Sequence, residues 1–364
     1  MASFGPCIRS VPVVARRPGV SLSSPALLVR SRKAERLNGN NLKQPEHPRP
    51  TTLHDAKRKR LAFVGAGRLG SSLAQAAASA GYRVTAISTR RPEQRAWLAA
   101  KLPSARIFAS PAEAAASADI TFITASDRAI EDICQSVTWA RGHAVVHCAG
   151  ALGLDVLRHA EAAGAATGGL HPLQSFPDAS SVSRLWGVAF AVESRDPSLR
   201  EWLRTFARGL GGNPFDILPE HRAAYHASAV LASGMLAGLI SLAAQMWGQM
   251  GVPRDRAIES LLPLVETTVA AVREKGLPTA MTGPYVRGDS ETVAKHLTAL
   301  GALPEDIARS YASLALAQMP VAMEQGGVAE TQRAEIEQIL RAALAASRPS
   351  RSEQERALTK EPSL

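Results

Sequence analysis

Short apolar runs alternate with longer amphipathic or Ala-rich stretches from residue 61 onward. The runs are expected to form strands, and the stretches between them are expected to form helices. The expected strands cover residues 61–64, 81–88, 106–109, 119–125, 144–147 and 187–193. Alternation of this kind predicts an α/β fold with a parallel sheet and right-handed crossovers.

After residue 193 the pattern becomes helical, with expected helices at 199–208 and over 219–251. Residues 227–252 contain no charged side chain, and Gly234 and Gly238 form a GxxxG pair. This run predicts either a long helix buried at a domain or subunit interface or a membrane-anchoring helix. Its serine and glutamine side chains favour the buried helix.

The chain is therefore expected to divide into a disordered basic tail (1–60), a dinucleotide-binding Rossmann domain (61–193), an all-α substrate and dimerisation domain (194–346) and a loose tail (347–364). Residues 1–60 hold 13 Lys and Arg but 3 Asp and Glu, whereas residues 61–364 hold 29 of each, so the net charge of +10 belongs to the first tail. A body without net charge argues against nucleic-acid binding. The Arg- and Ser-rich tail is either an unstructured extension or an organellar import signal.

The motif Gly65-Ala66-Gly67-Arg68-Leu69-Gly70 follows the first expected strand and opens a helix. This placement of GxGxxG is typical of a turn that holds a dinucleotide. Gly65 permits the tight turn, Gly67 lets the backbone approach the pyrophosphate, and Gly70 lets helix and strand pack closely. The amides at the helix start, around Arg68 and Leu69, then face the phosphate.

The second expected strand ends in Ser88-Thr89-Arg90-Arg91. NAD-selective sites usually carry Asp or Glu here, which accepts a hydrogen bond from the ribose 2′-hydroxyl. The segment 88–91 has no carboxylate, but it has two guanidinium groups and two hydroxyls. It therefore favours a 2′-phosphate and hence NADP(H). The alternative is that Arg90 and Arg91 only form a solvated helix entry.

Later strands end in residues that we expect beside the nicotinamide, because ligands of parallel sheets bind at the carboxyl ends of the strands. Ser126 and Asp127 follow one strand, residues 147–151 follow the next, and Asp127 is also expected to cap a helix. His171 precedes Pro172, which favours an extended turn. On such a loop the imidazole is a candidate proton donor or orienting group, or it hydrogen-bonds only the loop.

The helical half adds three candidates. His226 lies on a polar helix face at the domain junction, where it either faces substrate or is a satisfied core group. Arg287 either clamps a substrate carboxylate or pairs with Asp289, which is an expected N-cap. His296 follows on the next helix, as a further polar partner for the substrate. Cys7, Cys134 and Cys148 show no metal-ligand spacing, so no metal site is expected.

Three segments resemble a family of predicted oxidoreductases that join a Rossmann-like domain to a helical domain of unassigned function: 168–176, Tyr225-His226-Ala227 and 282–297. The resemblance covers about residues 61–320. It extends more distantly to ketopantoate reductase, pyrroline-5-carboxylate reductase and prephenate dehydrogenase, and implies a 6-phosphogluconate-dehydrogenase-like helical half. The chain departs from the family pattern at Ala149, where serine is common, and at Gly234, where asparagine is usual.

Together these features predict an NADP(H)-dependent oxidoreductase that moves a hydride to or from a small carbonyl, imine or hydroxy-acid substrate between the two domains. The catalytic candidates are His171, His226, Arg287 and His296. The alternative is a non-catalytic NADP(H)-binding sensor or scaffold, which the two departures favour. The expected partner is a second copy of the chain, with neither nucleic acid nor membrane. The expected compartment is the cytoplasm, or an organelle if the tail is an import signal.

Overall fold

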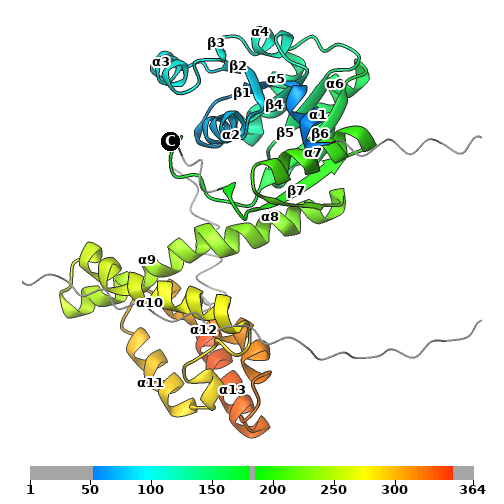
Figure 1. The fold of residues 1–364 in the computed structure, drawn as a ribbon. Coiled ribbons are helices and arrows are strands. Elements are labelled where there is room, and N and C mark those ends of the chain that lie inside the picture. The colour runs from blue at the N-terminus through cyan, green and yellow to red at the C-terminus, as the bar shows by residue number, and fades with distance from the viewer. Residues whose placement is uncertain (1–51, 181–184, 347–364) are drawn as a thin grey trace, which may run out of the picture. The chain divides into compact units, whose positions relative to one another are not determined.

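The computed structural model describes residues 52–180 and 185–346. Most of the expected first tail and the whole of the expected last tail lie outside the described residues. Figure 1 draws the sheet-bearing part of the chain in blue to green and the helices that follow it in yellow-green to red.

One eight-stranded sheet has the order β3-β2-β1-β4-β5-β6-β7-β8. Neighbouring strands are parallel, except that β6 and β7 are antiparallel. The strands are β1 (Arg60–Val64), β2 (Arg83–Ser88), β3 (Arg106–Phe108), β4 (Ile120–Ile123), β5 (Ala144–His147), β6 (Ala166–Pro172), β7 (Ala189–Ser194) and β8 (Asn213–Asp216). The predicted Rossmann-type parallel sheet is confirmed.

Two of these strands were not expected from the sequence. His171 lies inside β6 and not on a loop, because Gly168 and Gly169 hide the strand from a pattern based on side chains. β8 carries Pro214, which is tolerated because β8 is an edge strand. The sheet therefore continues past residue 193, where the domain was expected to end.

Helices cover both faces of the sheet. On one face, α2 and α7 share a core with β1, β4 and β6, and on the other α4, α5 and α6 pack against the same strands. These helices and their neighbours are α1 (Leu53–Arg58), α2 (Arg68–Ser79), α3 (Pro92–Lys101), α4 (Pro111–Ala116), α5 (Asp127–Gln135), η1 (Leu154–Leu157), α6 (Arg158–Ala162) and α7 (Pro197–Gly209). The helix α1 lies within the expected disordered tail. It is held by a Thr52 cap and by the buried Ala56, whose carbonyl accepts from Trp202 Nε1 at 3.3 Å.

Side chains of successive strand residues point to opposite faces of the sheet, and each set packs against the helices on its face. In β1, Phe63 points to the face covered by α2 and α7, whereas Val64 points to the face covered by α4. Phe63 stacks on Phe122 of β4 with ring centroids 5.0 Å apart, and Phe122 stacks on Phe206 of α7 at 5.2 Å. This apolar core gives the strand ends a rigid support.

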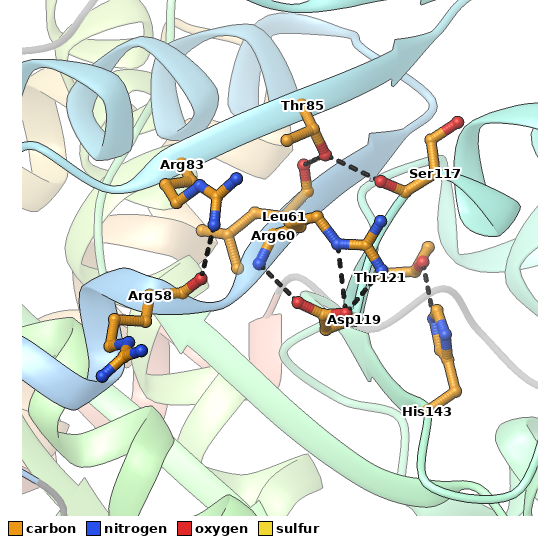
Figure 2. Close-up of polar contacts among 9 residues, drawn as sticks. All are labelled: Arg58, Arg60, Leu61, Arg83, Thr85, Ser117, Asp119, Thr121 and His143. Carbon is orange, nitrogen blue, oxygen red and sulfur yellow. Dashed lines mark hydrogen bonds and ion pairs between the residues drawn. The ribbon is translucent and has the colours of Figure 1, made fainter.

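Polar contacts close the amino-terminal edge of the sheet (Figure 2). Asp119, before β4, accepts from Arg60 of β1 through the backbone N–H at 2.8 Å and through Nη2 at 2.7 Å. His143, before β5, shares a 2.9 Å hydrogen bond with Thr121 of β4. These pairs fix the register of neighbouring strands at the edge opposite the glycine turn.

The remaining helices form the second part of the chain. They are η3 (Pro219–His221), α8 (Arg222–Val230), η4 (Leu231–Met235), α9 (Leu236–Met246), η5 (Trp247–Met250), α10 (Arg254–Lys275), η6 (Tyr285–Arg287), α11 (Ser290–Leu300), α12 (Glu305–Met323) and α13 (Glu330–Ala346). A separate core joins η6, α11, α12 and α13. The continuous helical stretch Pro219–Met250 is long and apolar enough to cross a membrane. Only 6% of its most apolar 18-residue segment is buried inside the chain. The expectation of a buried helix is therefore not met within a single chain.

Candidate functional site

The glycine turn after β1 has the geometry of a dinucleotide cradle. Gly65 has φ of +82°, and a Cβ there would lie 2.8 Å from Ala125. A Cβ on Gly70 would lie 2.2 Å from Thr124 Oγ1, so this glycine lets α2 pack against β4. A Cβ on Gly67 would meet nothing nearer than 4.0 Å. The space above Gly67 is therefore open, as it must be where a phosphate approaches the backbone.

A cavity of about 550 Å³ extends from this turn to the ends of β2 and β4. Among the predicted coenzyme-binding residues, those that line it are Gly65, Gly67, Ser88, Thr89, Arg90, Arg91 and Ser126. Arg68, Leu69, Gly70 and Asp127 are not in its wall. Asp127 is also not the cap that was expected, since Ser126 is the N-cap residue of α5 and Asp127 is its first helical residue.

Gln94 and Asp132 are among the wall residues that the sequence-based prediction missed. The Gln94 amide of α3 donates to Ala66 O and accepts from Thr89 Oγ1 at 3.0 Å, and so bridges the glycine turn and the end of β2. The sequence signal that could have identified Gln94 is its position as the third residue of a helix that starts with Pro92. Asp132 of α5 contributes the one carboxylate in the described wall.

Arg90 and Arg91 follow β2, and both are exposed. Within the described part of the chain, neither guanidinium group has a hydrogen-bond or salt-bridge partner. Both line the cavity beside Ser88 and Thr89. Their donors are thus free to bind an anion, in the geometry that planar guanidinium groups offer to a phosphate.

A second group of polar residues lies at the carboxyl ends of β5 and β6. His171 Nδ1 is 2.8 Å from Tyr225 Oη of α8, a hydrogen bond in which either atom can donate. Burial, followed by the charges of His226 and Arg222, lowers the pKa of His171 to about 4. Burial raises the pKa of Tyr225 to about 12. Near pH 7 the pair therefore consists of a neutral imidazole and a protonated phenol.

His226 joins this group. Its ring lies 5.9 Å from that of His171, and its buried Nδ1 has no hydrogen-bond partner among the described residues. Gly150, after β5, separates the two imidazoles: a Cβ there would be 2.5 Å from His226 Nδ1 and 3.0 Å from His171 Nε2. The structure thus brings together two of the four predicted catalytic residues, and adds Tyr225.

Beneath them lies a buried ion pair that the sequence did not reveal. Arg222 is 1% exposed, and its Nε donates to Glu193 of β7. His147 is fully buried beside it, and burial, then the Arg222 charge, lowers the pKa of His147 to about 3. Nothing in the local pattern around Glu193 predicts that it pairs with a residue 29 positions later.

Arg287 lies in η6 and His296 lies in α11. His296 Nδ1 lies 2.8 Å from Tyr311 Oη, and no described contact links either candidate to His171. Arg287 is exposed, and its guanidinium group has no described partner. Asp289 is the predicted N-cap: it accepts from Thr292 N at 3.0 Å, and hydrogen bonds from Thr292 hold the pKa of Asp289 below its ordinary value.

A cavity of about 400 Å³ is lined by His296 and Tyr311. Two larger cavities contain none of the predicted site residues. One of about 640 Å³ lies at the amino-terminal edge, beside His143 and Trp202. Another, of about 660 Å³, is lined by Gln75 and Tyr82. Ligands of parallel sheets bind beyond the carboxyl ends of the strands. We therefore place the site at the glycine-turn cavity and the His171 group, which share that edge.

Two family models match parts of the chain. A family model described as NADP oxidoreductase, coenzyme F420-dependent, matches residues 60–150, and one for a domain of unknown function matches residues 188–318. A candidate NADP oxidoreductase from Bacteroides fragilis is similar at 25% identity and a TM-score of 0.58, over 73% of this chain and 99% of that one. Residues 60–150 therefore match an NADP oxidoreductase family, and the chain as a whole has the fold of a Rossmann-like oxidoreductase.

Two other solved structures share the fold of this chain. A protein from Thermotoga maritima has 20% identity and a TM-score of 0.51, over 79% of this chain and 100% of that one. A reductive aminase from Aspergillus terreus has 13% identity and a TM-score of 0.50, over 79% of this chain and 94% of that one. No curated protein sequence matches the chain.

Proposed function

We propose that this protein is an NADP(H)-dependent oxidoreductase that acts on a small carbonyl, imine or hydroxy-acid substrate. The observation that carries the proposal is the shared sheet edge: the open glycine cradle lies at the end of β1, and the His171–Tyr225 pair lies three strands away, at the end of β6. At a strand spacing of about 4.8 Å this is about 14 Å along the edge, which suits a dinucleotide laid across it.

NADP(H) fits the residues present. The open space above Gly67 receives the pyrophosphate, and the amides at the start of α2 face it. Arg90 and Arg91 hold the 2′-phosphate, whereas Asp132 is the one carboxylate of the described wall, and its charge would repel the phosphate. When bound, the coenzyme supplies or accepts the hydride.

The protein's own part of the reaction is the proton. In the tautomer with its proton on Nδ1, His171 donates to Tyr225 Oη and leaves the phenol proton free for the substrate heteroatom. The high pKa of Tyr225 keeps this proton in place until the substrate gains charge. His171 is thus the orienting group rather than an imidazolium acid, because its pKa of about 4 keeps it neutral near pH 7.

The test is NADPH oxidation by the full chain over a panel of oxo acids, imines and ketones, with NADP⁺ and hydroxy acids for the reverse direction. We expect Tyr225→Phe to lower turnover by about 10²–10⁴-fold, the usual contribution of general acid catalysis, with NADPH affinity unchanged. His221→Phe is the control, because His221 lies one residue before α8. Tight NADPH binding without turnover on any substrate would favour a sensor or scaffold. Equal turnover in Tyr225→Phe and wild type would remove Tyr225 from the mechanism.

We also propose that the protein acts as a homodimer in the cytoplasm. The stretch Pro219–Met250 exposes several large apolar side chains, among them Leu231, Met235 and Met250. Its first turn is tied into the sheet-bearing part by Arg222, and folded elements precede and follow it, so a second copy suits this surface better than a bilayer.

The oligomeric state tests this proposal. Sedimentation without detergent is expected to show a dimer that Leu231→Glu with Met235→Glu converts to monomer. Trp186→Glu, a change at an exposed side chain outside the helices, is expected to leave the dimer intact. A monomeric wild type, or partition into membranes, would contradict the proposal.

A further inference from the structure

Three strands place one residue each in a single row across the sheet. His147 of β5 is paired with Gly169 of β6, and Gly169 is paired with Glu193 of β7. Residues directly opposite each other present their side chains on the same face. Because Gly169 has no side chain, the row leaves a gap between an imidazole and a carboxylate.

Arg222 fills this gap. Its Nη2 lies 2.2 Å from the position that a Gly169 Cβ would take, and its Nε donates to Glu193. Its Nη1 donates to the carbonyls of Ala149 at 3.1 Å and Gly150 at 3.4 Å. One buried guanidinium group thus joins β7, the loop after β5 and the first residue of α8.

The same helix carries the residues of the reacting pair. Tyr225 and His226 follow Arg222 by three and four positions, so all three share a face of α8. His171 follows Gly169 by two positions in β6, so it points to the face that Arg222 covers. Burying two charges is expensive, and an ion pair of this kind is better explained by what it orients than by stability.

We propose that Arg222, held by Glu193, is a positioning residue that fixes α8 on the sheet so that Tyr225 meets His171 beside Gly150. This inference rests on the proposed function. It assigns to Arg222 no contact with substrate or coenzyme, since the side chain is 1% exposed.

The electrostatic surroundings agree with this role. The titratable or charged groups that face His171 are His147 from β5, Glu193 from β7, and Arg222, Tyr225 and His226 from α8. The Arg222 charge is one of the causes of the low pKa of His171, after burial and His226. The Glu193 charge is not among these causes, so removing both charges together should still raise the pKa of His171 and let the imidazole become charged at a higher pH.

The decisive variant is Glu193→Gln with Arg222→Met, which removes both charges at similar volume. Arg222→Met alone would leave the Glu193 carboxylate buried and unpaired, and so confuse unfolding with function. We expect the double variant to keep its fold and NADPH affinity, to lose about 100-fold in turnover, and to lose activity at a higher pH than wild type when acidified. Arg204→Met with Asp216→Asn removes an exposed ion pair of the same type, and should change neither turnover nor pH profile.

Arg222→Lys keeps the charge but cannot make the same forked contacts. It is expected to lose turnover while the pH profile stays near that of wild type. Wild-type turnover in Arg222→Lys, or wild-type turnover and pH profile in a folded double variant, would overturn the positioning role. If the double variant does not fold, Arg222→Lys alone decides.

A measurement without substrate separates this inference from the proposed function. The pKa of His171, followed by NMR of the imidazole, should be about 4 in wild type and higher in the double variant. An unchanged pKa would count against the role of Arg222. Absence of turnover in wild type would count only against the proposed function.

Discussion

At the β1–β2 end of the sheet edge the groups offered to a ligand are backbone amides, hydroxyls and exposed guanidinium groups. At the β5–β7 end they are an imidazole and a phenol held over a buried ion pair. Arg90 is exposed without a described partner, whereas Arg222 is 1% exposed and bonded on two sides. The first arginine is available to a ligand, and the second organises the protein itself.

Because the two ends offer different groups, substitutions at one end should affect coenzyme binding and substitutions at the other should affect the reaction. Substitutions at the β1–β2 end should alter coenzyme affinity and leave the His171–Tyr225 pair as it is. Substitutions at the β5–β7 end should do the reverse.

The sharpest test compares two glycines of one turn. Gly67→Val should raise the dissociation constant of NADPH by about 100-fold or more, because the side chain occupies the space the pyrophosphate needs. Its thermal stability should stay near that of wild type, because a Cβ on Gly67 meets nothing within 4.0 Å. Calorimetric titration and thermal unfolding measure the two effects.

The matched control is Gly70→Val. Its Cβ would lie 2.2 Å from Thr124 Oγ1 and 3.0 Å from Gly65 O, so this variant should lose about 1–3 kcal/mol of stability through overpacking. NADPH bound by Gly67→Val as tightly as by wild type would show that the turn does not hold the pyrophosphate.

A smaller effect is expected from Arg90→Ala and Arg91→Ala. Each removes charge-assisted hydrogen bonds to the 2′-phosphate, so NADPH should bind about 10- to 100-fold more weakly, while NADH affinity stays constant. Arg83→Ala, at the other end of β2, is the control and should change neither. An equal loss for both coenzymes would contradict the assignment of NADP(H).

A further effect concerns the dependence of stability on pH. His147 and His171 have folded pKa values of about 3 and about 4, below the 6.5 of a free imidazole. Between pH 6.5 and 4 the unfolded chain therefore takes up protons that the folded chain does not, and the free energy of unfolding falls as the pH falls. Each group contributes about 1.4 kcal/mol per pH unit at most.

His147→Asn should make this fall shallower, since one of the two groups is gone. Denaturant unfolding between pH 7 and 4 measures it. The same slope in His147→Asn and wild type would mean that His147 is not held neutral by its surroundings.

The two ends also differ in how far the sequence predicts them. The glycine turn was predictable because strand, glycines and helix are contiguous, so local rules apply from Leu61 to Gly70. The sequence did not indicate a role for Gln94, because that role depends on the tertiary contact between α3 and Ala66.

The other end is assembled from distant segments. His171 was identified as a candidate from its motif, but its place in β6 and its bond to Tyr225, 54 positions later, depend on tertiary packing. The pairing of Glu193 with Arg222 could not be predicted locally, because each has other polar or charged residues beside it and the two lie 29 positions apart. Whether Arg287 and His296 take part in the reaction remains a prediction.

Tyr225 can act on a substrate beside the nicotinamide only if both ends of the sheet edge form one site, and NMR titration with two ligands tests whether they do. NADP⁺ is expected to shift the Gly67 amide and the His171 imidazole, whereas adenosine 2′,5′-bisphosphate, which lacks the nicotinamide half, should shift only resonances at the β1–β2 end. If saturating NADP⁺ shifts Gly67 but leaves the His171 imidazole unchanged, the two ends are separate and the proposed reaction at Tyr225 fails.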